Sequence, residues 1–151
     1  MHAHLAPVNP RSLEGIDGVQ WLARDEALLV DNHRIGIKAL FEPQRLIEWL
    51  DQSSVRRAWV SIPPPLYRQQ LSRRAAAAWV GYLNAELLAV CAASHGRLEA
   101  LYYLPLEHPD LLSELCQQCT DEFVGVALAA GGASGHRVLA RALRAVVAMD
   151  E

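Results

Sequence analysis

Two histidines near the amino terminus have the type and spacing of a metal site. His2 and His4 are separated by one residue. On an extended strand, side chains two positions apart point to the same face, so both imidazoles can reach one cation. Imidazole suits zinc and other borderline divalent ions, and a catalytic zinc usually keeps one coordination position open for water or substrate. The pair predicts part of a metal site, although two histidines near a terminus are more often a solvated tail.

Cysteines and a glycine-rich stretch are the other features of the sequence that could take part in chemistry. Cys116 and Cys119 form a C-x-x-C, and Cys91 makes the number of cysteines odd. No second Cys or His pair has zinc-finger spacing, so we expect these thiols to pack on a helix face rather than to bind zinc or exchange disulfides. The glycine-rich residues 131–135 lack the Lys-Ser/Thr pair of a phosphate loop, which favours a plain connecting loop.

Strands and helices that could position the histidines alternate along the chain after an irregular opening. Short β-rich runs bounded by proline or glycine predict strands, and apolar residues recurring every three or four positions predict helices. Strands are expected at 2–4, 58–62, 98–104 and 123–130, and helices at 43–52, at 69–94, from Pro109 onward and at 138–149. Residues 27–37, with the turn pair Asp31-Asn32, predict a small β-hairpin inserted after the first strand.

This alternation predicts an α/β fold with a parallel sheet and right-handed crossovers. Four strands and four helices amount to about the first four βα units of a (β/α)8 TIM barrel. The 151 residues form one domain and fall short of the roughly 250 residues of a closed barrel. A complete, doubly wound four-stranded domain is the alternative, although no G-x-G-x-x-G follows an early strand.

Composition and charge exclude several classes of partner. The net charge of −3 comes from interspersed acids and bases, and no basic run is present that could neutralise nucleic acid or an anionic membrane. The longest apolar stretches fall well below the roughly 18 residues that a membrane span requires, and the amino terminus has no signal-peptide pattern. We therefore expect a soluble, cytoplasmic protein that binds neither nucleic acid nor a membrane.

Many short segments of this sequence have the order and spacing of segments in a known protein family. They include His-Ala-His-Leu-Ala-Pro at 2–7 and Val-Ser-Ile-Pro-Pro-Pro at 60–65, with further segments at 29–32, 35–36, 41–51, 83–87, 95–98, 103–109 and 123–128. Together they resemble the amidohydrolase-related family that includes aminocarboxymuconate-semialdehyde decarboxylase. The resemblance covers essentially the whole chain and rests on many short matches rather than on one long motif.

The resemblance implies a metal-dependent carbon–carbon lyase or hydrolase that acts on a small carboxylated or aromatic substrate. His2 and His4 match the family's first two metal ligands, and the metal is expected to be zinc. Arg34, in the hairpin insertion, which resembles a lid, is the candidate for binding the substrate carboxylate, with an ordinary surface arginine as the alternative. The family's later histidine and aspartate have no counterpart in these residues, so no catalytic residue is assigned and little activity is expected.

The sequence also departs from the family pattern at both ends. Met1 directly precedes His2, where the family has a hydrophobic strand, and the chain stops at Glu151, where the family continues into a fifth strand. Truncation at both ends is therefore expected. The main alternative function is a noncatalytic half-barrel that forms homodimers or pairs with another chain through its open edges. A complete small α/β binding domain is the third alternative.

Overall fold

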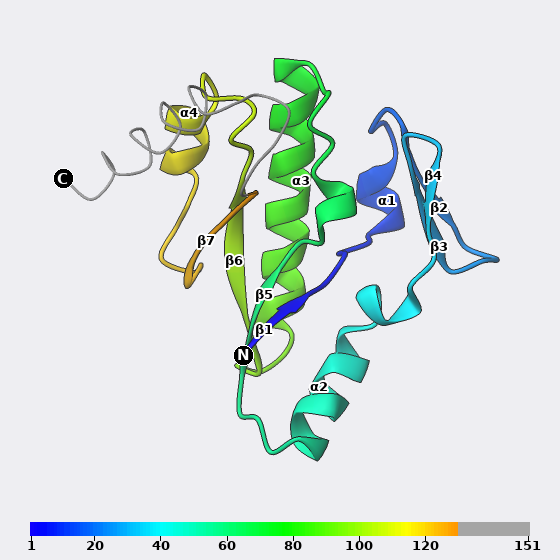
Figure 1. Ribbon diagram of the computed structural model, residues 1–151, viewed down its shortest axis with the longest axis vertical. Helices are drawn as coiled ribbons and strands as arrows, with labels where there is room; N and C mark the ends of the chain where they lie inside the picture. The colour runs from blue at the N-terminus through cyan, green and yellow to red at the C-terminus, as the bar shows by residue number, and fades with distance from the viewer. Residues whose placement is uncertain (130–151) are drawn as a thin grey trace.

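A four-stranded parallel sheet forms the centre of the computed structural model, which describes residues 1–129. The expected final helix at 138–149 and the glycine-rich residues 131–135 lie outside the described residues. The strands are ordered β1 (His2–His4), β5 (Ala58–Ser61), β6 (Leu98–Leu104) and β7 (Gly125–Leu128), and every neighbouring pair is parallel (Figure 1). A doubly wound sheet reverses its strand order at one point, and no reversal occurs among residues 1–129.

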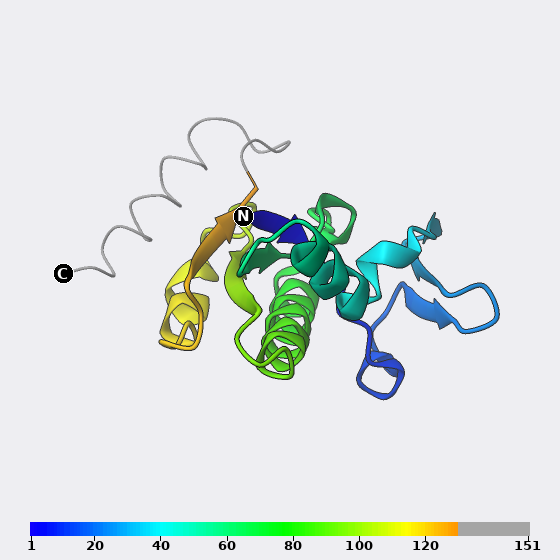
Figure 2. The ribbon, with the colours of Figure 1, turned by 90° about the horizontal axis from the view of Figure 1, so that it is seen from below.

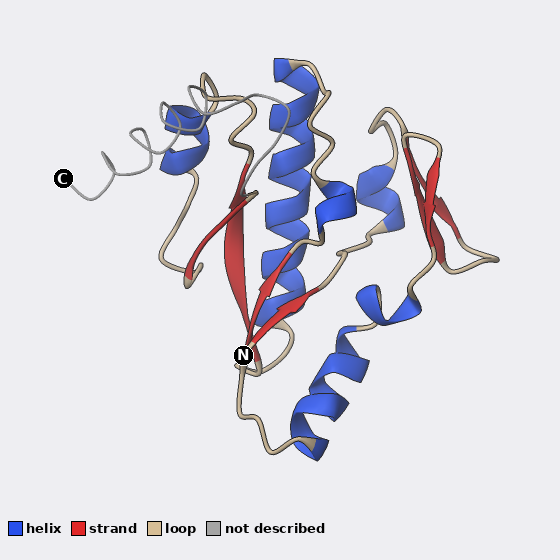
Figure 3. Ribbon diagram, in the orientation of Figure 1, coloured by secondary structure: helices blue, strands red, loops and turns tan. Residues whose placement is uncertain are grey.

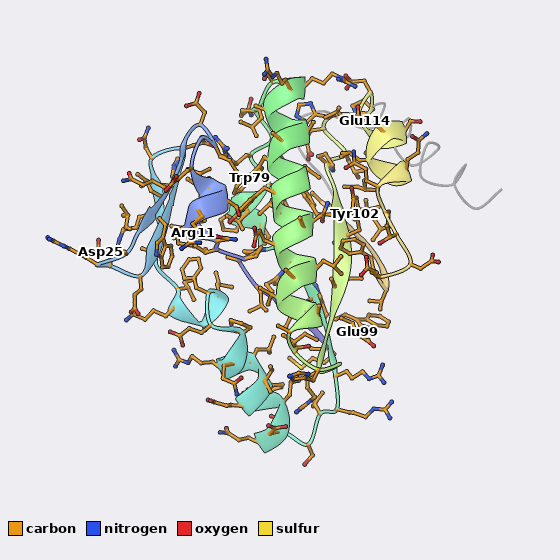
Figure 4. All side chains as sticks on the ribbon, turned by 180° about the vertical axis from the view of Figure 1, so that it is seen from behind. Arg11, Asp25, Trp79, Glu99, Tyr102 and Glu114 are labelled. Atoms are coloured by element: carbon orange, nitrogen blue, oxygen red, sulfur yellow. The ribbon has the colours of Figure 1, made fainter. Side chains whose placement is uncertain are left out.

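Helices connect the successive strands of this sheet. They are α2 (Pro43–Gln52), α3 (Arg73–Ala92) and α4 (Leu112–Gln117). The long helix α3 lies against one face of the sheet, as Figures 2 and 4 show. Alternate residues of β5 face opposite ways, so Val60 is fully buried whereas Trp59 is 52% exposed on the face away from α3. The predicted parallel α/β arrangement is confirmed for the described residues.

A second, antiparallel sheet of three strands is inserted between β1 and α2. It contains β2 (Val19–Leu22), β3 (Ala27–Val30) and β4 (His33–Ile35), and lies apart from the parallel sheet in Figure 3. The predicted hairpin is confirmed as β3 and β4, joined by Asp31 and Asn32 with φ of +46° and +65°, as a two-residue hairpin turn requires. The strand β2 was not predicted because it follows an irregular stretch broken by Gly15 and Gly18, and no turn pair such as Asp31-Asn32 marks its connection to β3.

Short helical segments lie within the insertion and also after β5. Helix α1 (Pro10–Leu13) precedes β2, and the 3₁₀ turn η1 (Lys38–Leu40) leads into α2. A second 3₁₀ turn, η2 (Pro64–Leu66), follows β5, where the proline run prevents further strand pairing. These segments place the insertion beside the carboxyl ends of β1 and β5.

Several predicted boundaries shift in the structure. Helix α4 begins at Leu112 rather than Pro109, because the residues between them form hydrogen-bonded turns, such as the bond from the Leu111 amide to the His108 carbonyl. Cys116 is buried on this helix, but Cys119 lies beyond its end, so the prediction that both thiols share one helix face is wrong for Cys119. The strand β7 is shorter at both ends than predicted.

Helix α3 is the one helix among the described residues that is long and apolar enough to cross a membrane by length and composition. Its side chains Trp79, Leu83 and Leu87 are almost completely buried in the core of the domain. A core helix of a soluble protein has the same length and composition, and packing of α3 on the sheet gives the described residues the form of a soluble domain.

Candidate functional site

The two histidines are the first and last residues of the short strand β1, and His4 lies level with Ser61, where β5 ends. Strands β1 and β5 pair in register, with His2 opposite Trp59 and His4 opposite Ser61. The Trp59 amide donates to the Met1 carbonyl at 2.8 Å, and the Leu5 amide donates to the Ser61 carbonyl at 3.1 Å, so backbone bonds hold β1 in place on both sides of the pair. The carboxyl end of parallel strands is the usual place for a ligand in α/β proteins.

Both imidazoles approach the same hydroxyl group. The distance to Ser61 Oγ is 2.8 Å from His2 Nε2 and 3.1 Å from His4 Nδ1. The two rings meet edge to face with their centroids 4.8 Å apart. The side chains therefore share one face of β1, as their spacing predicts, and two of their nitrogens converge on one point. Two imidazoles this close together on one face of a strand can share one ligand.

Hydrogen bonding leaves one nitrogen of His4 available for a metal ion. His4 Nδ1 lies 3.2 Å from the carbonyl oxygen of Ile62, which can only accept a hydrogen bond. The proton is therefore on Nδ1, and Nε2 carries the free lone pair. A histidine that ligates metal typically donates its other N–H to a carbonyl in this way. Burial, the nearby charge of His4 and the terminal amine lower the pKa of His2, which favours its neutral, ligand form.

The residues present fit part of a metal centre. Two imidazoles on one face suit zinc, but no group of three or more His, Cys, Asp or Glu side chains gathers anywhere in residues 1–129. A catalytic zinc usually takes three protein ligands. The pair is therefore a half-site, to which another ligand must be added for a closed coordination shell.

A pocket of about 480 Å³ lies directly beside His4. Its walls include Leu40 of η1 and the side chains of Arg45 and Trp49 from α2. The Ala6 amide donates to the Leu40 carbonyl at 2.7 Å and so brings η1 against the end of β1. The sequence did not predict this pocket. The pattern of α2 indicates an amphipathic helix, but it does not say that this helix lies beside His4.

Arg34 lies on the outer side of the insertion. It is on β4, and its guanidinium is 3.4 Å from the carboxylate of Asp25, with both side chains more than half exposed. Figure 4 shows Asp25 at the outer tip of the antiparallel sheet. Among the described residues, no hydrogen bond or ion pair joins Arg34 to the histidine pair, and its assignment to substrate binding stays a prediction.

A second hollow, of about 580 Å³, opens near the ends of β5 and β7. Tyr67, Gln69 and Leu128 line it. Gln69 Nε2 donates to Glu107 Oε1 at 2.6 Å, and Glu107 Oε2 is buried without a hydrogen-bond partner among the described residues. Burial and the Glu107 charge raise the pKa of Tyr67. No residue spacing in the sequence indicated this group, since its members come from two separate loops.

The three cysteines are free thiols with little nucleophilic character. Burial raises the pKa of Cys91 to about 11 and also raises the pKa values of Cys116 and Cys119. The reactive form of cysteine is the thiolate, which these shifts disfavour at neutral pH. The thiols therefore behave as small apolar side chains.

Comparison with known protein families and curated proteins gives no functional assignment, so the proposal below is based on the geometry of the site. No family model matches the chain, and no curated protein matches it in sequence. The resemblance to the amidohydrolase-related family therefore stays a prediction, carried by the short segments quoted above. The converging histidines at the carboxyl ends of β1 and β5 are the feature with the clearest chemical meaning.

Proposed function

We propose that this protein binds a divalent metal ion, most naturally zinc, through His2 and His4. The pair would form the first part of the metal centre in a (β/α)8 barrel of the amidohydrolase-related, decarboxylase-like type. The described strands would be the first four of that barrel. The proposal places the protein in the cytoplasm, where reduced cysteines are normal.

The observation that carries the proposal is that both imidazoles lie on one face of β1 with their ring centroids 4.8 Å apart, which is close enough to share one metal ion. The sheet order supports the barrel, because strands that follow one another in the chain are also neighbours in the sheet, as in a (β/α)8 barrel. A bound zinc ion would supply Lewis acidity toward a substrate oxygen or water. The role of this chain is to hold the two imidazoles in orientation.

The pocket beside His4 supports a small carboxylated or aromatic substrate. Arg45, whose Nε lies 3.3 Å from Glu42 Oε2, can donate from its terminal nitrogens to a carboxylate, and Trp49, which is 45% exposed, offers an aromatic face. In this proposal Arg34 remains the candidate for a second contact to the carboxylate. Activity of the isolated chain is expected to be absent or very weak, because no third His, Cys, Asp or Glu joins the histidine pair within residues 1–129.

Calorimetric titration of untagged protein with zinc tests the proposal. Wild-type protein should bind one zinc ion per chain, and the double variant His2→Ala, His4→Ala should lose this binding. The matched control is His33→Ala, His95→Ala, which removes two exposed histidines outside the proposed site and should bind as the wild type does. Equal zinc binding by both double variants would rule out the histidine pair as the site.

A noncatalytic half-barrel that self-associates is the second candidate. In residues 1–129, β1 pairs only with β5, so its other edge is open, and Trp59 is half exposed on the uncovered face of the sheet. Open edges and exposed aromatic side chains favour association. Light scattering during gel filtration should then show a dimer that Trp59→Glu dissociates and Ile37→Glu, at an exposed site in the insertion, does not. A monomer at all concentrations would exclude this function.

A further inference from the structure

Ser61 occupies the point on which the two imidazoles converge. It is the last residue of β5, and only 2% of its surface is exposed. Its hydroxyl group contacts His2 Nε2 and His4 Nδ1, while the adjacent Ile62 carbonyl also faces His4 Nδ1. A hydroxyl group is both donor and acceptor, so it can link two imidazoles in a defined direction.

The direction of this hydrogen-bond chain follows from the carbonyl group. Because the Ile62 carbonyl cannot donate, the proton between it and His4 belongs to Nδ1, at 3.2 Å. The same N–H faces Ser61 Oγ at 3.1 Å, which makes the hydroxyl oxygen an acceptor there. Ser61 is then free to donate its own proton to His2 Nε2 at 2.8 Å. A hydroxyl oxygen can also accept two hydrogen bonds, so the direction at His2 is part of the inference: where Ser61 donates to Nε2, the His2 proton lies on Nδ1.

We propose that Ser61 sets the tautomer of His2 and covers the lone pair of His2 Nε2, so that a metal ion binds there only after the hydroxyl group has turned away. The inference rests on the proposed metal site and adds a residue that controls access to it. His4 keeps its orientation without Ser61 because the Ile62 carbonyl still accepts its proton. Ser61 is thus a positioning residue that competes with the metal for one ligand.

Nitrogen-15 NMR of the metal-free protein tests the first half of this inference. In wild-type protein both histidines should carry the proton on Nδ1. In Ser61→Ala the tautomer preference of His2 should be lost, while that of His4 should persist. Ser61→Thr, which keeps a hydroxyl group, should restore the wild-type pattern, and Ser94→Ala, which removes another buried hydroxyl group, should leave it unchanged. An Nε2–H tautomer of His2 in wild-type protein would overturn the inference.

Zinc titration of the same variants tests the second half. Removing one competing hydrogen bond should tighten zinc binding by Ser61→Ala roughly two- to twelvefold. Ser61→Thr and Ser94→Ala should bind as the wild type does. Unchanged or weaker binding by Ser61→Ala would overturn the covering role and show that the hydroxyl group orients or ligates instead. Absence of zinc binding in every variant would refute the proposed function together with the covering role, while the tautomer pattern would still decide the first half.

Discussion

The buried amide of Asn84 shows how one polar side chain can take the place of a strand. Its Nδ2 donates to the Tyr103 carbonyl at 3.0 Å, and its Oδ1 accepts from the Tyr103 amide at 2.8 Å. Strand β5 stops pairing with β6 at Ala100, so without Asn84 these two backbone groups would have no strand beside them. The side chain therefore satisfies both groups and fastens α3 to β6.

Asn84→Ala should lower the free energy of unfolding by about 2–4 kcal/mol, because two buried backbone groups would lose their partners. Urea unfolding followed by circular dichroism measures this change. The control Gln117→Ala, at an exposed amide in α4, should stay within about 0.5 kcal/mol of the wild type. A loss below about 1 kcal/mol in Asn84→Ala would mean that water replaces the amide at Tyr103.

At the scale of elements, Arg68 links the loop after β5 to the antiparallel sheet. Its side chain is 4% exposed and donates to both carboxylate oxygens of Asp31, at 2.8 and 2.6 Å. It also donates to the Asp17 carbonyl and lies over the ring of Trp79. A Cβ atom on Gly18 would come within 2.5 Å of both the guanidinium and the carboxylate, so this approach requires glycine. This Arg68–Asp31 clamp holds the insertion against the loop that follows β5.

This clamp should make stability depend on pH. The hydrogen bond and charge of Arg68 lower the pKa of the Asp31 carboxyl group in the folded state. Since the folded pKa lies below the unfolded value of about 3.9, the contribution is complete above that value and is lost as the pH falls through the folded pKa. Asp31 is half exposed, so we expect about 1 kcal/mol at neutral pH.

Thermal unfolding of wild-type protein and Asp31→Asn between about pH 7 and pH 2 measures this contribution. The melting temperature of the variant should be lower at neutral pH, and the two temperatures should approach each other in acid. Asp121→Asn, at an exposed aspartate, should show no such convergence. If the difference in melting temperature between wild type and Asp31→Asn stayed constant down to the lowest pH, the ionised carboxylate of Asp31 would not be what stabilises the contact with Arg68.

At the scale of the whole molecule, local patterns predicted most of the fold. Helix α2 and strand β6 have the predicted bounds, because proline and apolar periodicity mark them within a few residues. The site depends on contacts between distant residues: His4 meets Ser61 across 57 positions, and Arg68 meets Asp31 across 37. No local spacing encodes such contacts, which is why Ser61, the clamp and the pocket beside His4 were not predicted.

The central claim is that His2 and His4 bind one metal ion together, and X-ray absorption at the zinc edge of untagged, zinc-loaded protein tests it most directly. The account predicts two imidazole ligands with Zn–N distances of about 2.0–2.1 Å, the remaining positions being filled by oxygen. In His2→Ala, His4→Ala the imidazole signal should disappear. Sulfur at about 2.3 Å would assign the metal to Cys116 and Cys119 instead, and fewer than two imidazoles would contradict the shared site.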